Sequence, residues 1–504
     1  MFQLIDVFWA YTLIAILILV GRLIRQRIGI LKSLFIPSSV VAGVIALLLG
    51  PSALGAVIKA TVGVDSPLIN GIFPEPILMV WSKSPGVFIN IVFATLFLGQ
   101  LIPGWRTIWQ QASPQAAFGQ VLGWGQYVIG LILGITVLTP IFNLPPIAAA
   151  LIEVAFEGGH GTSAGMAATF NELGFPEAAD LSLTLATVGL VSGIVIGTWL
   201  IDWGRRTGRI QIQRQDEQID LGINQDSIHT HTEEHPTIIA ARDRLFRDLL
   251  IDPISLNFGF VGLAVAIGWL ILQALGFIES ITWGSGDGLK LIAYVPLFPM
   301  ALIGGILVQL LLVRTNRSYM VSRPLMERIG GLALDVTIVT ALASISLTAL
   351  GANLVPLLIL SVAGIVWNIS VYVFLAPRLI PFYASERGLG DFGQSMGVTA
   401  TGILLLRMVD PDNRTGAFEC FAYKQLLFEP ILGGGLFTAA APALIVRYGS
   451  IPVLLLTSTI LAFWLIFGIW NCKQLRKVVK QEELPYKVLL FTIPLLKLME
   501  SVLG

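Results

Sequence analysis

The chain has 504 residues, of which 55% are hydrophobic and only 12% are charged, and its mean hydropathy is +0.82. This composition excludes an ordinary water-soluble domain, in which roughly 25% of residues are charged. The 31 basic and 31 acidic side chains cancel at neutral pH, so nothing indicates a nucleic-acid partner. The lipid bilayer is therefore predicted to surround most of the chain.

Long apolar stretches recur along the sequence, and each approaches the ~20 residues that a helix needs to cross the hydrocarbon core. In the first half, crossings are predicted at residues 4–21, 34–50, 87–102, 118–138 and 181–203. Clusters of lysine and arginine mark cytoplasmic ends, and they occur at residues 22–32, 106, 205–214, 314–328, 378–387 and 473–480. The N-terminus is then predicted to lie outside the cell (plasma or inner) membrane.

The segment at residues 147–170 does not fit this count as an ordinary crossing. Two full crossings after residue 138 would leave Arg205 and Arg206 outside, against the usual position of basic residues. The conflict disappears if this segment, which is interrupted at residues 157–161, enters the membrane and returns as a re-entrant hairpin. Broken backbone is tolerated at membrane depth only where it is buried or lines a cavity.

The second half repeats the pattern in the opposite sense. Crossings are predicted at residues 254–275, 291–313, 331–350, 354–375 and 421–446, and a second hairpin is predicted at residues 383–409. A helix at residues 453–470 has no counterpart upstream and returns the chain to the cytoplasm. The predicted fold is an all-α polytopic membrane protein with two inverted-topology repeats of about five transmembrane helices and one re-entrant helical hairpin each, plus an extra C-terminal helix.

Four regions follow from this count. They are an N-terminal repeat at residues 1–204, a cytoplasmic linker at 205–250, the inverted repeat at 251–447, and the extra helix with its tail at 448–504. The tail from residue 484 is apolar but short, which favours a segment that lies on the membrane surface. The C-terminus is predicted to be cytoplasmic.

The linker contains three of the four histidines. His229, His231, Glu233 and His235 have the composition of a metal site, but a solvated linker is the favoured interpretation. Cys420 and Cys472 lie in or beside apolar segments without metal-type spacing, so they are predicted to be buried apolar residues without a structural disulfide.

The two interrupted segments are related to each other. At an offset of 232, Gly158, Gly161, Ser163, Gly165, Ala168 and Thr169 align with Gly390, Gly393, Ser395, Gly397, Ala400 and Thr401. A second match aligns Gly86, Asn90 and Thr95 with Gly331, Asp335 and Thr340. Duplication accounts for both matches, and an odd number of crossings in each half inverts the second copy, as in many secondary transporters.

A helix that is broken by glycine at membrane depth exposes backbone groups to a ligand. Its N–H groups and positive dipole end favour a carboxylate, while unwound carbonyls and hydroxyls suit a dehydrated cation. The alternative is that small residues only allow close helix packing, as is predicted for Gly189, Gly193 and Gly197. Ionisable residues beside the glycines favour a ligand pathway, because such groups are costly at membrane depth.

The candidate residues divide into two groups. Substrate-binding candidates are Gly159, His160, Gly161, Thr162, Ser163, Asp391, Gln394, Ser395, Gly397 and Thr399, and sodium-binding candidates are Asn90, Glu157, Asp335, Thr169 and Thr401. Asp391 is the favoured partner of a substrate ammonium group. Asp335 lies about one turn into a helix predicted to begin at residue 331. Its carboxylate is predicted to bind a cation or an ammonium group, and the alternative is an ion pair with an arginine or lysine. Structural ion pairing and coupling remain equal alternatives for Glu153, Lys424 and Glu429.

The run Gly158-Gly159-His160-Gly161-Thr162 resembles the Gly-Gly-His-Gly-Thr run in the first hairpin of the sodium/glutamate symporter family. The order of helices and hairpins is similar over residues 4–446. Gly397, Thr399 and Thr401 fit the family's second hairpin motif, Gly-x-Gly-Ala-Thr-Pro-Thr-Ala.

Three features depart from the family's pattern. Ala400 replaces a proline, Glu153 and Glu157 are acidic where the family is usually neutral, and the helix after Gly449 is additional. The resemblance implies sodium-coupled uptake of glutamate or a related small anionic amino acid, with Na⁺ as coupling ion and no organic cofactor. It also implies a homodimer that works by elevator-type alternating access.

Other functions remain open at this point. The chain could carry another organic anion or amino acid with sodium or proton coupling, or it could be a passive channel or receptor. Residues 161–165 fit the G-x-S-x-G pattern with His160 beside Ser163, as in a serine hydrolase. However, residues 393–397 repeat that pattern without a histidine, so the pattern follows the duplication and the chain is predicted not to be an enzyme.

Overall fold

The computed structural model describes residues 3–482, apart from residues 64, 70, 101, 103, 213–241, 243–251, 283–291 and 412. Within these ranges the regular structure is entirely helical, and nine helices are long and apolar enough to cross a membrane. The predicted all-α membrane class is confirmed. The histidines at 229, 231 and 235, Glu233 and the tail from residue 484 lie outside the described residues.

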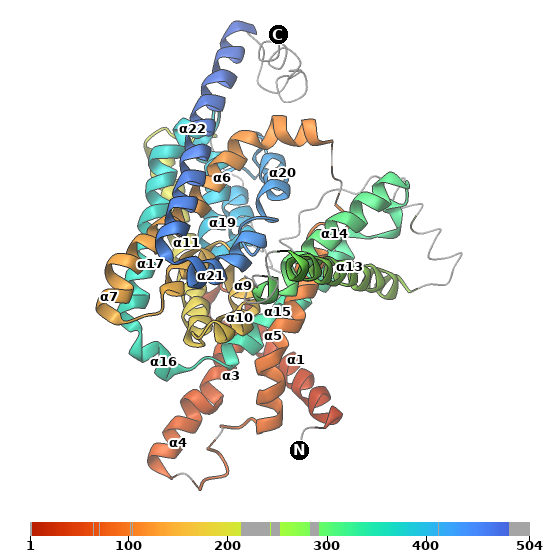
Figure 1. The fold of residues 1–504 in the computed structure, drawn as a ribbon, viewed down its shortest axis with the longest axis vertical. Coiled ribbons are helices and arrows are strands. Elements are labelled where there is room, and N and C mark those ends of the chain that lie inside the picture. Colours follow the sequence, from red (N-terminus) through yellow and green to blue (C-terminus); the bar gives the residue numbers. More distant parts are fainter. Residues whose placement is uncertain are drawn as a thin grey trace.

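The first half contains four membrane-length helices, an interrupted segment and a fifth long helix (Figure 1). Its elements are α1 Leu4–Arg27, α2 Gly29–Ser33, α3 Ser38–Leu49, η1 Pro51–Gly55, α4 Ala56–Thr61, α5 Glu75–Thr95, α6 Trp105–Leu133, η2 Gly134–Leu138, α7 Thr139–Phe142, η3 Pro146–Ala150, α8 Leu151–Phe156, α9 Gly159–Gly165, α10 Ala167–Glu172 and α11 Glu177–Arg206. Acidic residues begin α11 and Arg205 and Arg206 end it, which complements the helix dipole.

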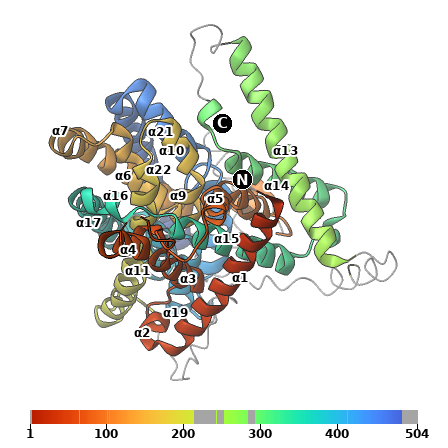
Figure 2. The same ribbon diagram turned by 90° about the horizontal axis from the view of Figure 1, so that it is seen from below.

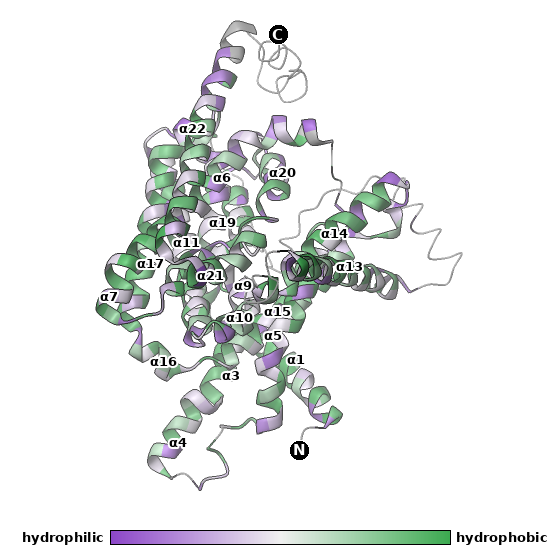
Figure 3. Cartoon of the chain, viewed as in Figure 1, coloured by the Kyte–Doolittle hydropathy of each residue, from purple (hydrophilic) through white to green (hydrophobic). Residues whose placement is uncertain are grey.

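The second half begins with α13, where Asp252 caps the helix by accepting from the Ser255 N–H group at 2.7 Å. Its elements are α13 Pro253–Ile281, η5 Ile292–Tyr294, α14 Leu297–Arg314, η6 Ser318–Met320, α15 Arg323–Ala343, α16 Leu347–Ala352, α17 Leu354–Ser370, η7 Val371–Leu375, α18 Ala376–Leu379, α19 Ala384–Val409, α20 Ala417–Phe428, α21 Leu436–Tyr448 and α22 Ser450–Glu482. Hydrophobic residues cover most of the membrane-length helices such as α17, while hydrophilic ones gather near the outer ends of α6 and α22 (Figure 3).

The helices form two bodies, and each body draws on both halves of the chain (Figures 1 and 2). In the first, called the α5/α15 body, α1, α3 and α5 pack with α13, α14 and α15 around separate apolar clusters. In the second, called the α6/α19 body, α6 and α8 to α11 pack with α17 to α22 around the largest apolar cluster, which also includes residues of α5 and α14. The segments that the predicted repeat aligns, α5 with α15 and the two interrupted segments with each other, therefore occupy the same body. The repeat and its inversion stay predictions.

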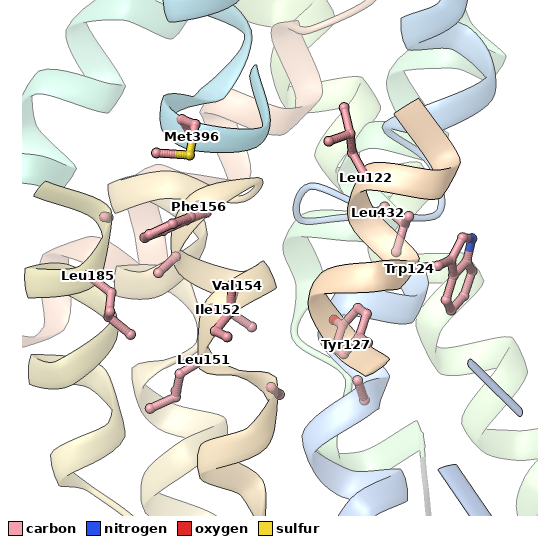
Figure 4. Packing of buried hydrophobic residues seen from close by; sticks show 14 of the residues in the cluster. Leu122, Trp124, Tyr127, Leu151, Ile152, Val154, Phe156, Leu185, Met396 and Leu432 are labelled. Atoms are coloured by element: carbon pink, nitrogen blue, oxygen red, sulfur yellow. The ribbon is translucent and has the colours of Figure 1, made fainter. Parts of the chain in front are cut away.

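The core of the α6/α19 body depends on glycines that admit large side chains. Phe156, at the end of α8, fills space beside Gly189 and Gly364, where a Cβ atom would lie 2.8 Å and 2.7 Å from the Phe156 ring (Figure 4). At Gly193, a Cβ atom would lie 2.6 Å from the Cβ atom of Met396. The predicted close-packing role of the glycines on α11 is thus confirmed.

The chain reverses within α19. Gly397 (φ −162°, ψ 45°) and Val398 (φ 62°, ψ 174°) are not helical, and a β-branched residue at positive φ is a backbone outlier. A Cβ atom on Gly402 would lie only 2.3 Å from the carbonyl oxygen of Gly390, although twelve residues of straight helix span about 18 Å. The parts of α19 before and after the break therefore pack backbone against backbone.

Gly402→Val is expected to destabilise this packing, because the new side chain meets the backbone of Gly390 rather than a movable side chain. Overpacking of this kind costs about 1–3 kcal/mol or more. The measurement is the yield of monodisperse protein on detergent size-exclusion chromatography. Gly262→Val on α13 is the control, because no atom lies within 4 Å of its Cβ position; equal yields of the two variants would contradict this packing.

Several predicted helices differ from those observed. The crossing predicted at 87–102 lies at Glu75–Thr95 (α5), and the crossing predicted at 118–138 begins earlier, at Trp105 (α6). The helix predicted from residue 331 begins at Arg323, so Asp335 lies near its middle and not one turn in. Arg323 is accommodated because its guanidinium donates to the carbonyls that end α5, including that of Leu96 at 2.9 Å. The crossing predicted at 421–446 is wrong as one helix, since Pro430 and three glycines separate α20 from α21.

Candidate functional site

A cavity of about 570 Å³ lies between the two bodies and is lined by both interrupted segments. Residues 157–161 contribute from the break between α8 and α9, and residues 397–401 contribute from the break in α19. The opposite wall comes from α1, α5 and α15. Segments that are more than 200 residues apart in the sequence thus meet at one site.

The two breaks touch each other at Gly159 and Val398. A Cβ atom on Gly159 would lie 2.2 Å from the Cγ1 atom of Val398, so a side chain at residue 159 would collide. Gly159 has a φ of +67°, which glycine adopts without the strain that other residues incur. Both the close approach and the backbone angle therefore require glycine at this position.

Glu157 places a buried carboxylate on the cavity wall. The residue is 2% exposed, and neither carboxylate oxygen has a hydrogen-bond partner among the described residues. The hydroxyls of Thr162 and Ser163, on α9, are also buried without a hydrogen-bond partner there. Lys424 acts electrostatically on Glu157, but burial of a carboxylate that accepts no hydrogen bond is still costly. Hard cations prefer carboxylate and hydroxyl oxygen atoms as ligands, so these groups are suited to a cation.

Glu429 joins the cavity to the second break. Its Oε1 atom accepts hydrogen bonds from the Thr399 hydroxyl at 2.9 Å and from Gln394 Nε2 at 3.3 Å. Gln425 Nε2 also donates to the Thr399 hydroxyl at 3.0 Å. Thr399 and Glu429 both line the cavity, and their hydrogen bond connects the break in α19 to the break between α20 and α21.

A buried ion pair stands behind this wall. Lys424 Nζ lies 3.1 Å from Asp391 Oδ1 and donates to Gln394 Oε1 at 2.6 Å, and it lies 3.9 Å from the centre of the Phe428 ring. Gln115 donates to the other Asp391 oxygen at 2.7 Å. Of the two alternatives for Lys424, the structure shows ion pairing, and its partner is Asp391. Asp391 does not line the cavity.

Both carboxylate oxygen atoms of Glu153 accept hydrogen bonds within the protein. Its Oε2 atom accepts from the Tyr127 hydroxyl at 2.6 Å, and its Oε1 atom accepts from the Gly433 N–H at 2.9 Å and the Thr438 hydroxyl at 2.7 Å. These bonds attach α8 to the glycine-rich segment before α21. Of the two acidic residues that depart from the family's pattern, Glu153 is satisfied by the protein, whereas Glu157 is not.

His160 lines the cavity but does not contact Ser163 by any hydrogen bond in the described structure. Its Nε2 atom lies 2.9 Å from the Thr187 hydroxyl, which itself donates to the Leu183 carbonyl at 3.2 Å. Nε2 is therefore assigned as the protonated nitrogen, which leaves Nδ1 as an acceptor. This geometry does not assemble the nucleophile and base that a serine hydrolase needs.

The predicted site residues fall into three places. Those on the cavity wall are Glu157, Gly159, His160, Gly161, Asp335, Gly397, Thr399 and Thr401, and those buried behind it are Thr162, Ser163, Asp391, Gln394 and Ser395. Asn90 donates to the Gly86 carbonyl of its own helix at 2.7 Å, and Thr169 donates to the Tyr294 carbonyl at 3.2 Å. These last two do not reach the cavity wall.

Many residues of the wall lie outside the predicted site, and four of them are charged, namely Arg25, Glu327, Arg328 and Glu429. Glu429 and Gly433 belong to the break before α21, and the signal for it was Pro430 followed by Gly433, Gly434 and Gly435 inside an apolar run. Arg25 of α1 and Arg328 of α15 also line the cavity. Nothing in their local sequence distinguishes them from the basic ends of ordinary membrane helices.

Comparison with known proteins identifies relatives over most of the chain. A family profile described as "Sodium/glutamate symporter" matches residues 4–410. The sodium/glutamate symporter of Haemophilus influenzae is 24% identical over 429 residues, which cover 84% of this chain and 91% of that protein. The sodium/glutamate symporter of Escherichia coli K12 is 24% identical over 446 residues, which cover 82% of this chain and 98% of that protein.

Proposed function

The chain belongs to the sodium/glutamate symporter family, and from this premise we propose that it is a sodium-coupled secondary transporter of glutamate or a related small anionic amino acid. The family consists of transporters, so the hydrolase alternative is set aside. The observation that carries the proposal is the convergence of both interrupted helices on one cavity beside the unpartnered carboxylate of Glu157.

Sodium is assigned to the first interrupted segment. Glu157 supplies negative charge, and the hydroxyls of Thr162 and Ser163 supply further oxygen atoms whose hydrogen-bonding capacity is unused by described residues. Asp335 and Thr401 remain sodium-binding candidates because they line the same cavity. Asn90 and Thr169 are left out of this assignment, because they do not line the cavity.

The anionic amino acid is assigned to the space between the breaks. Backbone N–H groups at residues 399–401, where the helix resumes after Val398, favour a carboxylate. Arg25 and Arg328 provide positive charge on the facing wall for the second carboxylate of a glutamate-like substrate. Glu429 is the preferred partner of the ammonium group, because it lines the cavity whereas Asp391 pairs with Lys424.

The transport cycle is proposed to follow the two-body arrangement. Both interrupted segments belong to the α6/α19 body, and the cavity lies against α5 and α15 of the other body. Movement of the α6/α19 body against the α5/α15 body gives elevator-type alternating access, with a homodimer as the working unit. In this proposal the segments are re-entrant hairpins of inverted repeats, the N-terminus is outside, and the linker and C-terminus are cytoplasmic.

Proteoliposomes with an inward sodium gradient are expected to concentrate labelled glutamate above its outside concentration. A potassium gradient of the same size is the control, and a sodium ionophore should abolish the accumulation. A passive channel would only bring the solute to equal concentrations on both sides. If uptake persists with the sodium ionophore but is abolished by a proton ionophore, the coupling ion is the proton and not sodium. Competition by aspartate, glutamine and 2-oxoglutarate then identifies which charged groups of the substrate are recognised.

A further inference from the structure

A second pocket, of about 510 Å³, lies away from the transport cavity, at one end of the α6/α19 body. Its wall combines the end of α11, the turn between α18 and α19, and α22. The residues that carry its chemistry are Arg209, Tyr383, Ala384, Ser385 and Arg476. Arg476 lies beyond residue 410, where the family profile match ends.

Two arginines are held in position at this pocket by the protein backbone. Arg476 donates to the carbonyls of Pro377 at 2.9 Å and Pro381 at 3.2 Å. Arg209 donates to the Val373 carbonyl at 3.2 Å, and its guanidinium lies 4.5 Å from the centre of the Trp203 ring. Because a guanidinium has five N–H donors, these contacts leave donors on both arginines for an anion.

The beginning of α19 adds backbone donors to the same pocket. Tyr383 adopts a left-handed conformation, and no side chain caps the helix. The N–H groups of Ala384 and Ser385, in the first turn, have no acceptor within the helix. Glu386 brings one carboxylate nearby, which is buried and accepts from the Gln211 N–H group, so two guanidinium groups outweigh it.

The pocket lies where three membrane spans end. The candidate spans Glu177–Arg206, Leu354–Leu379 and Ser450–Lys477 all finish at its walls. Trp199, stacked on Trp203, is 58% exposed on α11, and Trp470 is 45% exposed on α22. Exposed tryptophans followed by basic residues mark the interface between hydrocarbon and water, which places the pocket at the level of the lipid headgroups.

We propose that this pocket binds a phosphate group, supplied by the headgroup of an anionic phospholipid. Arg209, which follows α11, Arg476 of α22 and the N–H groups of a helix N-terminus match the oxygen atoms and the charge of a phosphate. Basic pockets between membrane helices recognise such headgroups. The bound lipid would join α22 to the turn that positions α19.

The test uses the full-length protein in detergent with added phosphatidylglycerol or phosphatidylcholine, followed by native mass spectrometry. The protein is expected to retain phosphatidylglycerol, and the double variant Arg209→Gln/Arg476→Gln is expected to bind it about tenfold more weakly or worse. The control Arg206→Gln/Lys473→Gln removes two exposed charges, at the end of α11 and on α22, that lie outside the pocket, and it should bind like the original chain.

Equal binding by the two double variants would overturn the proposal, as would equal retention of phosphatidylcholine and phosphatidylglycerol. A further arm adds inorganic phosphate without lipid. If phosphate stabilises the original chain against heat but phosphatidylglycerol does not, the lipid is the wrong source and the pocket binds a free phosphate. Thermal unfolding of each variant without ligand shows whether the substitutions alter the fold.

Discussion

Glu157→Gln weakens the apparent sodium affinity of uptake by about 10- to 100-fold, which is the expected effect of losing one charge-assisted contact to the ion. Glutamine keeps the shape of the side chain but lacks its negative charge. Because the carboxylate is buried without a partner among the described residues, its replacement should leave the empty protein at least as stable as before. The measurement is glutamate uptake into proteoliposomes over a series of sodium concentrations.

Two other glutamates separate this effect from a general loss of charge. Glu172→Gln, on the exposed surface of α10, should leave uptake unchanged. Glu153→Gln should instead lower the yield of folded protein, because the carboxylate accepts hydrogen bonds from Tyr127, Gly433 and Thr438. An unchanged sodium dependence in a well-folded Glu157→Gln protein would show that Glu157 does not bind the coupling ion.

Lys424→Met is expected to cost about 3–5 kcal/mol of folding stability, because it leaves Asp391 as a buried carboxylate without its partner. Addition of Asp391→Asn should restore much of this loss, since two neutral side chains of similar size require no charge compensation. The measurements are the yield of monodisperse protein and its thermal unfolding in detergent.

The control for the lysine change is Lys473→Met on the exposed part of α22, which should be neutral. Equal stability of Lys424→Met and the original chain would contradict a structural role for the pair. The double variant also tests the substrate site. If it folds and retains its affinity for glutamate, Asp391 is not the partner of the substrate ammonium group, and Glu429 remains as the proposed partner.

The class of the protein and two of the places where its helices break were predictable from residue composition and order. Apolar composition and stretches of membrane-spanning length predict helices in lipid without reference to any other part of the chain. The interruptions at residues 157–161 and within 383–409 were also predictable, because glycine changes backbone preferences locally. The Gly-Gly-His-Gly-Thr run then identified the family, and the profile match confirmed it.

Which polar groups are available to a ligand depends on packing between distant segments of the chain. Asp391 and Glu157 are both acidic residues beside glycines, yet one pairs with Lys424 and the other has no partner among the described residues. Tertiary packing also brings Arg25 of α1, Arg328 of α15 and Glu429 at the end of α20 to the wall of one cavity. Whether a buried charge is compensated depends on packing between segments that are far apart in the chain, and a local pattern does not record that packing.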